Sequence, residues 1–328
     1  MRELTYAQAL NEALREEMAA DPRVFLMGED IGHYGGIFRV TQDLLAEFGP
    51  ERVRDTPISE AAFIGAGLGA AMTGLRPVVE IMWVDFAMVA MDQIVNQVAK
   101  MRYMSGGQVA VPMVIRTQGG GGRGNAAQHS QSLEGLFAQI PGLKVVMPAT
   151  PADAKGLLKA AIRDDNPVIF IEHKMLYATR GPVPTGEHIV PLGRADIKRP
   201  GSHVTVVAWS RALLYALEAA ERLAAEGISA EVIDLRTVTP LDLDTIYESV
   251  RKTHRAVVAH EACTSFGPGA EIAARIQHDL FDELDAPVVR VGTVDTPLPY
   301  NRRLEATALV SADGIAAGIR AALEGALA

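Results

Sequence analysis

Short apolar runs alternate with stretches of helical periodicity along the first half of the chain. Thr5 and Gln8 form a capping box ahead of apolar positions 10, 14 and 18, which predicts a first helix. Apolar runs predict strands at 24–27, 77–83, 111–116, 143–147 and 168–172. Helical spacing predicts helices at 40–48, 60–71, 86–104 and 151–163, with another starting at 133. This alternation favours a parallel sheet with helices on both faces.

The same alternation returns in the second half. Strands are predicted at 204–209, 230–235, 256–260 and 288–291, and helices at 213–226, 241–250, 269–280 and 315–327. Between the halves, residues 179–201 carry four prolines and several glycines, which indicates a linker. We therefore predict an α/β protein of two doubly wound, mostly parallel-sheet domains, at 1–180 and 202–328, joined by a linker at 181–201.

Composition narrows the range of partners. Hydrophobic residues make up 48% of the 328 residues and mean hydropathy is +0.12, although no uncharged run is long enough for a convincing membrane span. We expect the excess apolar surface to lie in subunit interfaces. Lys and Arg number 31 against 40 Asp and Glu, a net charge of −9 without a basic run, which argues against nucleic acid and anionic membranes. The N-terminus lacks an apolar signal region, so a cytoplasmic location is expected.

Glu60 is the strongest candidate for chemistry. Pro57 favours an extended Thr56 and Ser59 is a good N-cap, so Glu60 falls in the first turn of a helix. Residues 61–75 carry no charge, and their alanines and glycines predict a helix buried on all sides. A carboxyl group there either complements the helix dipole or, being poorly solvated, has a raised pKa and shares a proton with a ligand nitrogen.

Two further polar residues border loops. Glu29 follows a predicted strand, at the edge where open α/β sheets bind ligands, although an acid there also commonly orders a loop. His129 lies between the glycine-rich residues 119–124, which we expect to be mobile, and a helix start. It is either an ordinary polar loop residue or a group that titrates near neutral pH.

Several common motifs are absent from the sequence. Gly65, Gly67 and Gly69 lie inside the helix and at the wrong spacing for a dinucleotide fingerprint, so we interpret them as close-packing positions. The glycine run lacks the Gly-Lys-Ser/Thr ending of a P-loop. Residues 260–264 (HEACT) lack the second histidine of a zinc peptidase, and no Gly-x-Ser-x-Gly elbow occurs. A single cysteine, Cys263, excludes an internal disulfide framework and a cysteine-cluster metal site.

Motifs spread over essentially the whole chain resemble the β subunit of the E1 component of 2-oxo acid dehydrogenase complexes. They are residues 28–30 (GED), 55–60 (DTPISE), 104–107 (MSGG), 127–132 (AQHSQS), 141–146 (PGLKVV) and 161–168 (AIRDDNPV). The resemblance implies an oxidoreductase that acts on an oxo group with a lipoyl disulfide as acceptor. It also implies thiamine diphosphate as cofactor, bound by a pyrimidine-binding first domain followed by a transketolase-like C-terminal domain.

The resemblance also assigns roles to residues. Glu60 matches the acid that hydrogen-bonds the aminopyrimidine N1′ and promotes its tautomerisation, and His129 matches a histidine that handles the lipoyl or substrate end. Phe86 matches an aromatic that stacks on the pyrimidine, while Glu29 and Ile58 match positions near the cofactor. Met82 lies where the substrate pocket is expected. A structural potassium ion is implied at backbone carbonyls, those of Met113, Ala161, Ile162, Asp164 and Asn166.

The chain lacks the Gly-Asp-Gly segment that holds magnesium and diphosphate in this family of enzymes. The resemblance therefore implies an E1 α subunit that supplies magnesium, an α2β2 heterotetramer with the cofactor shared between subunits, and docking to the peripheral-subunit-binding and lipoyl domains of the E2 acyltransferase. A pyruvate- or acetoin-type substrate is expected, with a branched-chain 2-oxo acid as the alternative. Two other hypotheses are a non-catalytic assembly subunit, and a dinucleotide dehydrogenase that the glycine spacing disfavours.

Overall fold

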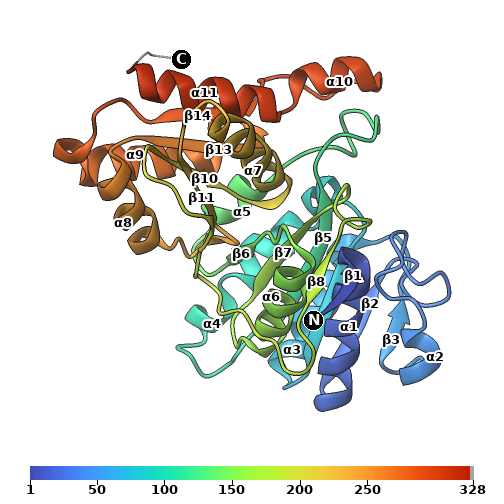
Figure 1. Ribbon diagram of the computed structural model, residues 1–328. Coiled ribbons are helices and arrows are strands. Elements are labelled where there is room, and N and C mark those ends of the chain that lie inside the picture. Colours follow the sequence, from blue (N-terminus) through green and yellow to red (C-terminus); the bar gives the residue numbers. More distant parts are fainter. Residues whose placement is uncertain (326–328) are drawn as a thin grey trace. The chain divides into compact units, whose positions relative to one another are not determined.

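The computed structural model describes residues 1–325, and the chain forms two compact units (Figure 1). The first consists of Met1–Gly119 and Leu136–Leu192, and the second of Gly120–Gly135 with the chain from Gly193 onward. The glycine-rich segment and His129 therefore belong to the second unit, although they lie within the first half of the sequence.

The first unit is built on a parallel sheet. Its strands are β2 (Val24–Gly28), β3 (Val53–Asp55), β4 (Arg76–Ile81), β5 (Val114–Gly119), β6 (Lys144–Val146) and β7 (Val168–His173). They are ordered β6-β7-β5-β4-β2-β3, and every neighbouring pair among them is parallel. All residues of β2, β5 and β7 are buried, as expected for a parallel sheet covered on both faces.

The main helices of the first unit begin where their caps predict. Helix α1 (Tyr6–Ala20) starts after Thr5, and the capping box with Gln8 is present in both directions. Helix α6 (Pro151–Arg163) matches its predicted bounds, with the Thr150 side chain accepting from the Asp153 amide. Helix α3 spans Glu60–Met72. The predicted capping box at Thr5 is confirmed, because it depends on a short local hydrogen-bond pattern, whereas the cap at Thr150 was not predicted.

Two predicted helices are wrong in extent. Of 40–48 only α2 (Leu44–Phe48) is helical, because Asp43 adopts a left-handed backbone with φ 67°. The predicted helix over 86–104 is a succession of a 3₁₀ helix (Val84–Ala90), a π helix (Gln93–Val98) and α4 (Met101–Met104). A short apolar pattern does not distinguish helices of 3.0, 3.6 and 4.4 residues per turn, so the sequence did not reveal this change of winding.

The proline-rich residues 179–201 contain two strands that were not predicted. Strand β8 (Arg180–Val183) pairs antiparallel with β1 (Arg2–Thr5), and β9 (Asp196–Arg199) pairs antiparallel with β11. Both are edge strands, where Pro182 is tolerated because an edge leaves part of its backbone unpaired.

The second unit holds another sheet, ordered β14-β13-β10-β11-β9, which is parallel except for β9. Its parallel strands are β10 (Val204–Ala208), β11 (Ala230–Asp234), β13 (Ala256–Cys263) and β14 (Val289–Thr293). Its longer helices are α7 (Ser210–Ala224), α8 (Leu243–Thr253), α9 (Pro268–Asp279) and α11 (Ala312–Glu324). Short elements are α5 (Glu134–Ala138), β12 (Thr237–Thr239), a 3₁₀ helix (Phe281–Glu283) and α10 (Arg302–Ala308). The predicted class, two doubly wound α/β domains, is confirmed, while the predicted last residues of the final helix, up to Leu327, lie outside the described residues.

One segment, Arg302–Glu324, is long and apolar enough by composition to cross a membrane. It consists of α10 and α11, which are separated around Val310. Helix α11 lies against the sheet, where a Cβ on Gly318 would come within 2.6 Å of Val291, and Ile315 and Ile319 are fully buried. These contacts are those of a core helix of the second unit.

Candidate functional site

The turn before α3 is held by Asp55 at the end of β3. Its carboxylate oxygens accept from the Gly32 amide (2.6 Å) and the His33 amide (3.2 Å), which ties the loop after β2 to this turn. Ser59 occupies the N-cap position, but its side chain makes no capping hydrogen bond, contrary to the expectation. Asp55 therefore fixes the approach to Glu60 where Ser59 was expected to do so.

Helix α3 is buried on one side and exposed on the other. Gly67 packs closely, because a Cβ there would lie 2.8 Å from Val79 and 2.9 Å from Met113. Ala62, Ala66 and Gly69 are exposed, so within the single chain the helix is buried on one side alone. Burial on all sides stays a prediction for the assembly with a partner subunit. The close-packing interpretation holds for Gly67, whereas Gly69 faces open space.

Glu29 and Glu60 form a buried carboxyl pair at the carboxyl edge of the first sheet. Their residues are only 7% and 5% exposed, and Glu29 Oε1 has no hydrogen-bond partner among residues 1–325. Burial, followed by the charges of Glu60, Asp30 and Glu80, raises the pKa of Glu29 to about 7. A buried carboxyl oxygen without a partner is costly, which makes this pair a candidate ligand-binding position.

A buried ionic network lies in the neighbouring strands. Arg116 on β5 donates to Glu80 on β4 at 2.6 Å and to both carboxylate oxygens of Glu172 on β7, at 2.7 and 2.8 Å. Tyr177 donates to Glu172 at 2.6 Å, and Gln118 donates to Glu80 at 3.0 Å. The sequence patterns did not predict this network. The charged residues that form it could have indicated it, because they interrupt otherwise apolar strands.

The other residues predicted near a cofactor also lie in the first unit, with different exposures. Met82 and Phe86 are half-buried after β4, and Ile58 is 81% exposed. Trp83 packs edge-on against Phe38, with ring centroids 5.8 Å apart, and the Lys174 Nζ lies 5.4 Å from its ring. Ile58 therefore exposes an apolar side chain to solvent two residues before the buried Glu60.

Four of the five carbonyls expected to hold potassium accept hydrogen bonds within the first unit. Arg76 Nη1 donates to the carbonyl of Ile162 at 3.0 Å and to that of Asp164 at 3.2 Å. The Met113 carbonyl accepts from the Val168 amide (2.9 Å), and that of Ala161 accepts from the Asp164 amide (3.3 Å). The guanidinium charge of Arg76 therefore lies against two of the five carbonyls. Each carbonyl oxygen has a second lone pair, so the potassium site stays a prediction.

The glycine-rich loop of the second unit is fixed by carboxylates. The Gly120 amide donates to the Gln131 carbonyl at 2.9 Å and closes the loop that carries His129. Glu261 accepts from the Gly121 amide at 2.5 Å. Glu305, only 1% exposed, accepts from the amides of Gly122 (2.9 Å) and Gly124 (2.7 Å). The expectation of a mobile loop did not foresee these bonds, because both acids are remote in sequence.

His129 is half-buried within this loop, and its amide approaches the Ala126 carbonyl at 3.4 Å. His129 belongs to the second unit, whereas Glu29 and Glu60 lie together in the first.

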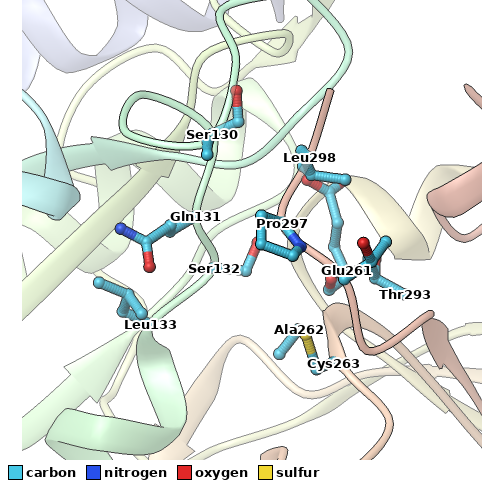
Figure 2. Close-up of a pocket in the computed structure, with 12 residues that line it drawn as sticks. Ser130, Gln131, Ser132, Leu133, Glu261, Ala262, Cys263, Thr293, Pro297 and Leu298 are labelled. Atoms are coloured by element: carbon cyan, nitrogen blue, oxygen red, sulfur yellow. Dashed lines mark hydrogen bonds between the residues drawn. The ribbon is translucent and has the colours of Figure 1, made fainter. Parts of the chain in front are cut away.

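A cavity of about 370 Å³ is lined in part by residues that flank His129 in the sequence (Figure 2). Ser130, Gln131, Ser132 and Leu133 form one side, and Glu261, Ala262 and Cys263 face them. The rest of the lining comes from Ala127, Thr293, Thr296, Pro297 and Leu298. His129 is not among the lining residues.

Ionisable groups are buried directly after the loop. Glu134, at the start of α5, accepts from the Trp209 ring nitrogen at 3.2 Å, and burial raises its pKa to about 7. Trp209 stacks on His260 with ring centroids 5.1 Å apart, and burial lowers the pKa of His260 to about 4. Near neutral pH His260 is therefore largely uncharged, while Glu134 is about half protonated.

Comparison with known proteins defines the class. Residues 2–180 match the family described as transketolase, pyrimidine binding domain, and residues 193–315 match transketolase, C-terminal domain. A solved structure titled split gene transketolase, inactive beta4 tetramer, has a TM-score of 0.80 and 25% identity, and the match covers 98% of both chains. The fold is thus that of two-domain transketolase-type proteins.

Closer relatives specify the family. The chain is 49% identical over 318 residues to pyruvate dehydrogenase E1 component subunit beta-2, mitochondrial, of Oryza sativa subsp. japonica, covering 96% of this chain and 85% of the relative. It is 49% identical to the corresponding Rhizobium meliloti subunit (98% and 70% covered) and 47% identical to 2-oxoisovalerate dehydrogenase subunit beta of Bacillus subtilis (98% and 98%). The chain belongs to the family of E1 β subunits of 2-oxo acid dehydrogenases, which confirms the resemblance drawn from its motifs.

Proposed function

We propose that this chain is the β subunit of a thiamine-diphosphate-dependent E1 enzyme that decarboxylates pyruvate and passes the acyl unit to a lipoyl group of E2. The observation that carries the proposal is the buried pair of Glu29 and Glu60, which lies within residues 2–180, the range that matches the pyrimidine-binding family. When bound, thiamine diphosphate supplies the thiazolium carbon that adds to the 2-oxo group and accepts the electron pair released on decarboxylation.

The two acids fit an aminopyrimidine in different ways. Glu60 begins α3 at the mouth of the pair and is proposed to exchange a proton with the pyrimidine N1′. Glu29, with its pKa raised to about 7, is about half protonated at neutral pH and has an oxygen without a partner. Protonation of Glu29 near neutral pH therefore limits its repulsion with the neighbouring Glu60 carboxyl.

The remaining site residues are proposed from their place beside this pair. Half-buried Met82 and Phe86 supply apolar contact for the pyrimidine and the substrate, and Ile58 supplies contact at the exposed end. His129 is proposed to deliver and accept protons when the acyl unit passes to the lipoyl group. A potassium ion at the carbonyls of Met113, Ala161, Ile162, Asp164 and Asn166 stays a proposal of structural character, with Arg76 bound to two of these carbonyls.

An α subunit is proposed to complete the cofactor site with magnesium. The amides of Gly121, Gly122 and Gly124 donate to Glu261 and Glu305, so the glycine loop does not present them to a diphosphate. An apolar surface for a partner is present on α3 and the 3₁₀ helix that follows β4. It includes the exposed Ile58, Ala62, Ala66, Met88 and Val89. We propose that this surface is covered in an α2β2 assembly.

The test is calorimetric titration of the isolated chain with thiamine diphosphate and magnesium, repeated after adding an E1 α subunit. We expect no binding by the chain alone, and binding with decarboxylation after mixing. Micromolar binding and turnover by the isolated chain would overturn the shared-site proposal. A cytoplasmic location stays a prediction, since the relatives include bacterial proteins and proteins named as mitochondrial.

Two alternatives have specific support. The Bacillus subtilis relative favours a branched-chain 2-oxo acid, which parallel assays of the assembled enzyme with pyruvate, acetoin and 2-oxoisovalerate would distinguish by kcat/KM. A non-catalytic assembly subunit is favoured by the similarity to a transketolase chain titled as an inactive tetramer. That alternative predicts no turnover with any of the three substrates after an E1 α subunit is added.

A further inference from the structure

The glycine-rich loop of the second unit binds a carboxylate of the same chain, that of Glu305. Gly122 and Gly124 have left-handed backbones, with φ of 98° and 68°, and their amides converge on the two oxygens of Glu305. Amides of residues i and i+2 that point to one side form a nest, an arrangement that binds phosphates and other anions in many proteins. In this nest the anion is a carboxylate from α10, buried with only 1% exposure.

The loop leaves little room for movement around this contact. A Cβ on Gly124 would lie 2.9 Å from the Tyr300 carbonyl, and one on Gly121 would lie 2.9 Å from the Leu309 side chain. The Gly121 amide donates to Glu261 at 2.5 Å. The Gly120 amide donates to the Gln131 carbonyl and closes the loop at its base. The segment between these anchors, 125–130, carries His129.

We propose that Glu305 is a positioning residue: its carboxylate clamps the amides of Gly122 and Gly124 and so sets the conformation of the loop that presents His129. The inference rests on the proposed function in its last step, because His129 has to act in acyl transfer for its position to matter. The first step, clamping of the loop, depends only on contacts within the second unit.

The decisive variant is Glu305→Gln, which keeps the size of the side chain but replaces one accepting oxygen with an NH₂ group that cannot accept from an amide. Hydrogen–deuterium exchange of the full chain should become about tenfold faster in residues 120–126, because charge-assisted hydrogen bonds to two amides are weakened. Exchange in β10 and β13 should not change. Glu221→Gln, an exposed acid on α7, is the matched control and should leave the loop unchanged.

Assembled with an α subunit, Glu305→Gln should lower acyl transfer to the lipoyl acceptor more than decarboxylation measured with an artificial electron acceptor. A double variant of Glu305→Gln with His129→Ala should be no slower than His129→Ala alone if Glu305 acts through His129. Gly124→Ala provides a second route, since its strained backbone displaces the loop while the buried acid stays intact.

Unchanged exchange in residues 120–126 of both Glu305→Gln and Gly124→Ala would overturn the clamp. Faster exchange with fully additive losses in the double variant would overturn positioning through His129. If His129→Ala itself transfers acyl groups at the wild-type rate, the proposed function fails. The same result overturns the last step of this inference, whereas the clamp is still judged by exchange.

Discussion

Arg116 meets Glu172 through two parallel hydrogen bonds, from Nε at 2.7 Å and from Nη2 at 2.8 Å, with both side chains withdrawn from solvent. The same guanidinium reaches Glu80 through Nη1, so one cation serves two buried acids. Glu80 also adds to the charge felt by Glu29. The network therefore supports the sheet beneath the proposed cofactor pair and contributes to its electrostatics.

We expect Arg116→Met to lower the free energy of unfolding by about 3–5 kcal/mol, because removing one partner leaves uncompensated buried carboxylates. Urea unfolding of the full chain at neutral pH measures the change. Arg320→Met, which breaks an exposed pair with Glu226, is the control and should have little effect. Equal stability of the Arg116→Met variant and wild type would show that the buried pair does not stabilise the fold.

Glu60→Gln should reduce turnover of the assembled enzyme by about 10²–10⁴-fold while the fold stays intact, since an amide occupies the same space but cannot exchange the proton. Hydrogen–deuterium exchange at the C2 carbon of bound thiamine diphosphate should slow in parallel. Circular dichroism checks the fold. Exchange at the wild-type rate would remove Glu60 from the proton path.

His129→Ala should separate two activities. We expect acyl transfer to a lipoyl acceptor to fall by about 10²-fold, with a smaller loss of decarboxylation measured with an artificial electron acceptor, because the proposed role of His129 is confined to the transfer step. An equal loss in the two assays would instead point to cofactor or substrate binding.

Glu29 should make stability depend on pH. Its pKa is raised from 4.5 to about 7 in the folded chain, so the stability it contributes is fully present below about pH 4.5 and is lost as pH rises through about 7. The free energy of unfolding of Glu29→Gln should therefore rise relative to that of wild type as the pH rises from about 4.5 to about 7. Above about pH 7 the difference between the two proteins should be constant. Urea midpoints at pH 5, 6 and 8 test this, and a pH-independent difference would contradict it.

Docking to the E2 core should weaken with salt. From the net charge of −9 we predict an acidic docking surface on the second domain, formed by Asp242, Asp244, Glu248, Asp282, Glu283 and Asp285. Asp244, Glu248 and Asp282 are exposed, whereas Asp242 is buried as the N-cap of α8. Glu283 and Asp285 are exposed but lie near Arg251 (3.9 Å) and Arg255 (2.9 Å). Replacing the three exposed acids with their amides should slow association with a basic subunit-binding module at low ionic strength. Association indifferent to salt would argue against this surface.

Local patterns predicted much of the fold. The cap at Thr5 placed α1, helical spacing placed α6, and apolar runs placed the parallel strands, because each pattern depends on neighbouring residues alone. The residues that stabilise the loop and sheet were not predicted. Glu305 and Gly124 are far apart in sequence, as are Arg116 and Glu172, and pairing of distant residues leaves no local pattern. The role of Glu60 came from family resemblance, with its burial as structural support.

The pairing of β1 with β8 sets an order on biosynthesis. Arg2 lies opposite Val183 in register, so β1 has no β8 partner until about 180 further residues have been made. At ribosomal speeds of about 5–20 residues per second, that delay is about 10–35 s. Because strands β2 to β7 are translated between β1 and β8, β1 cannot pair with β8 while that sheet is being made. During this time β1 is an unpaired strand edge.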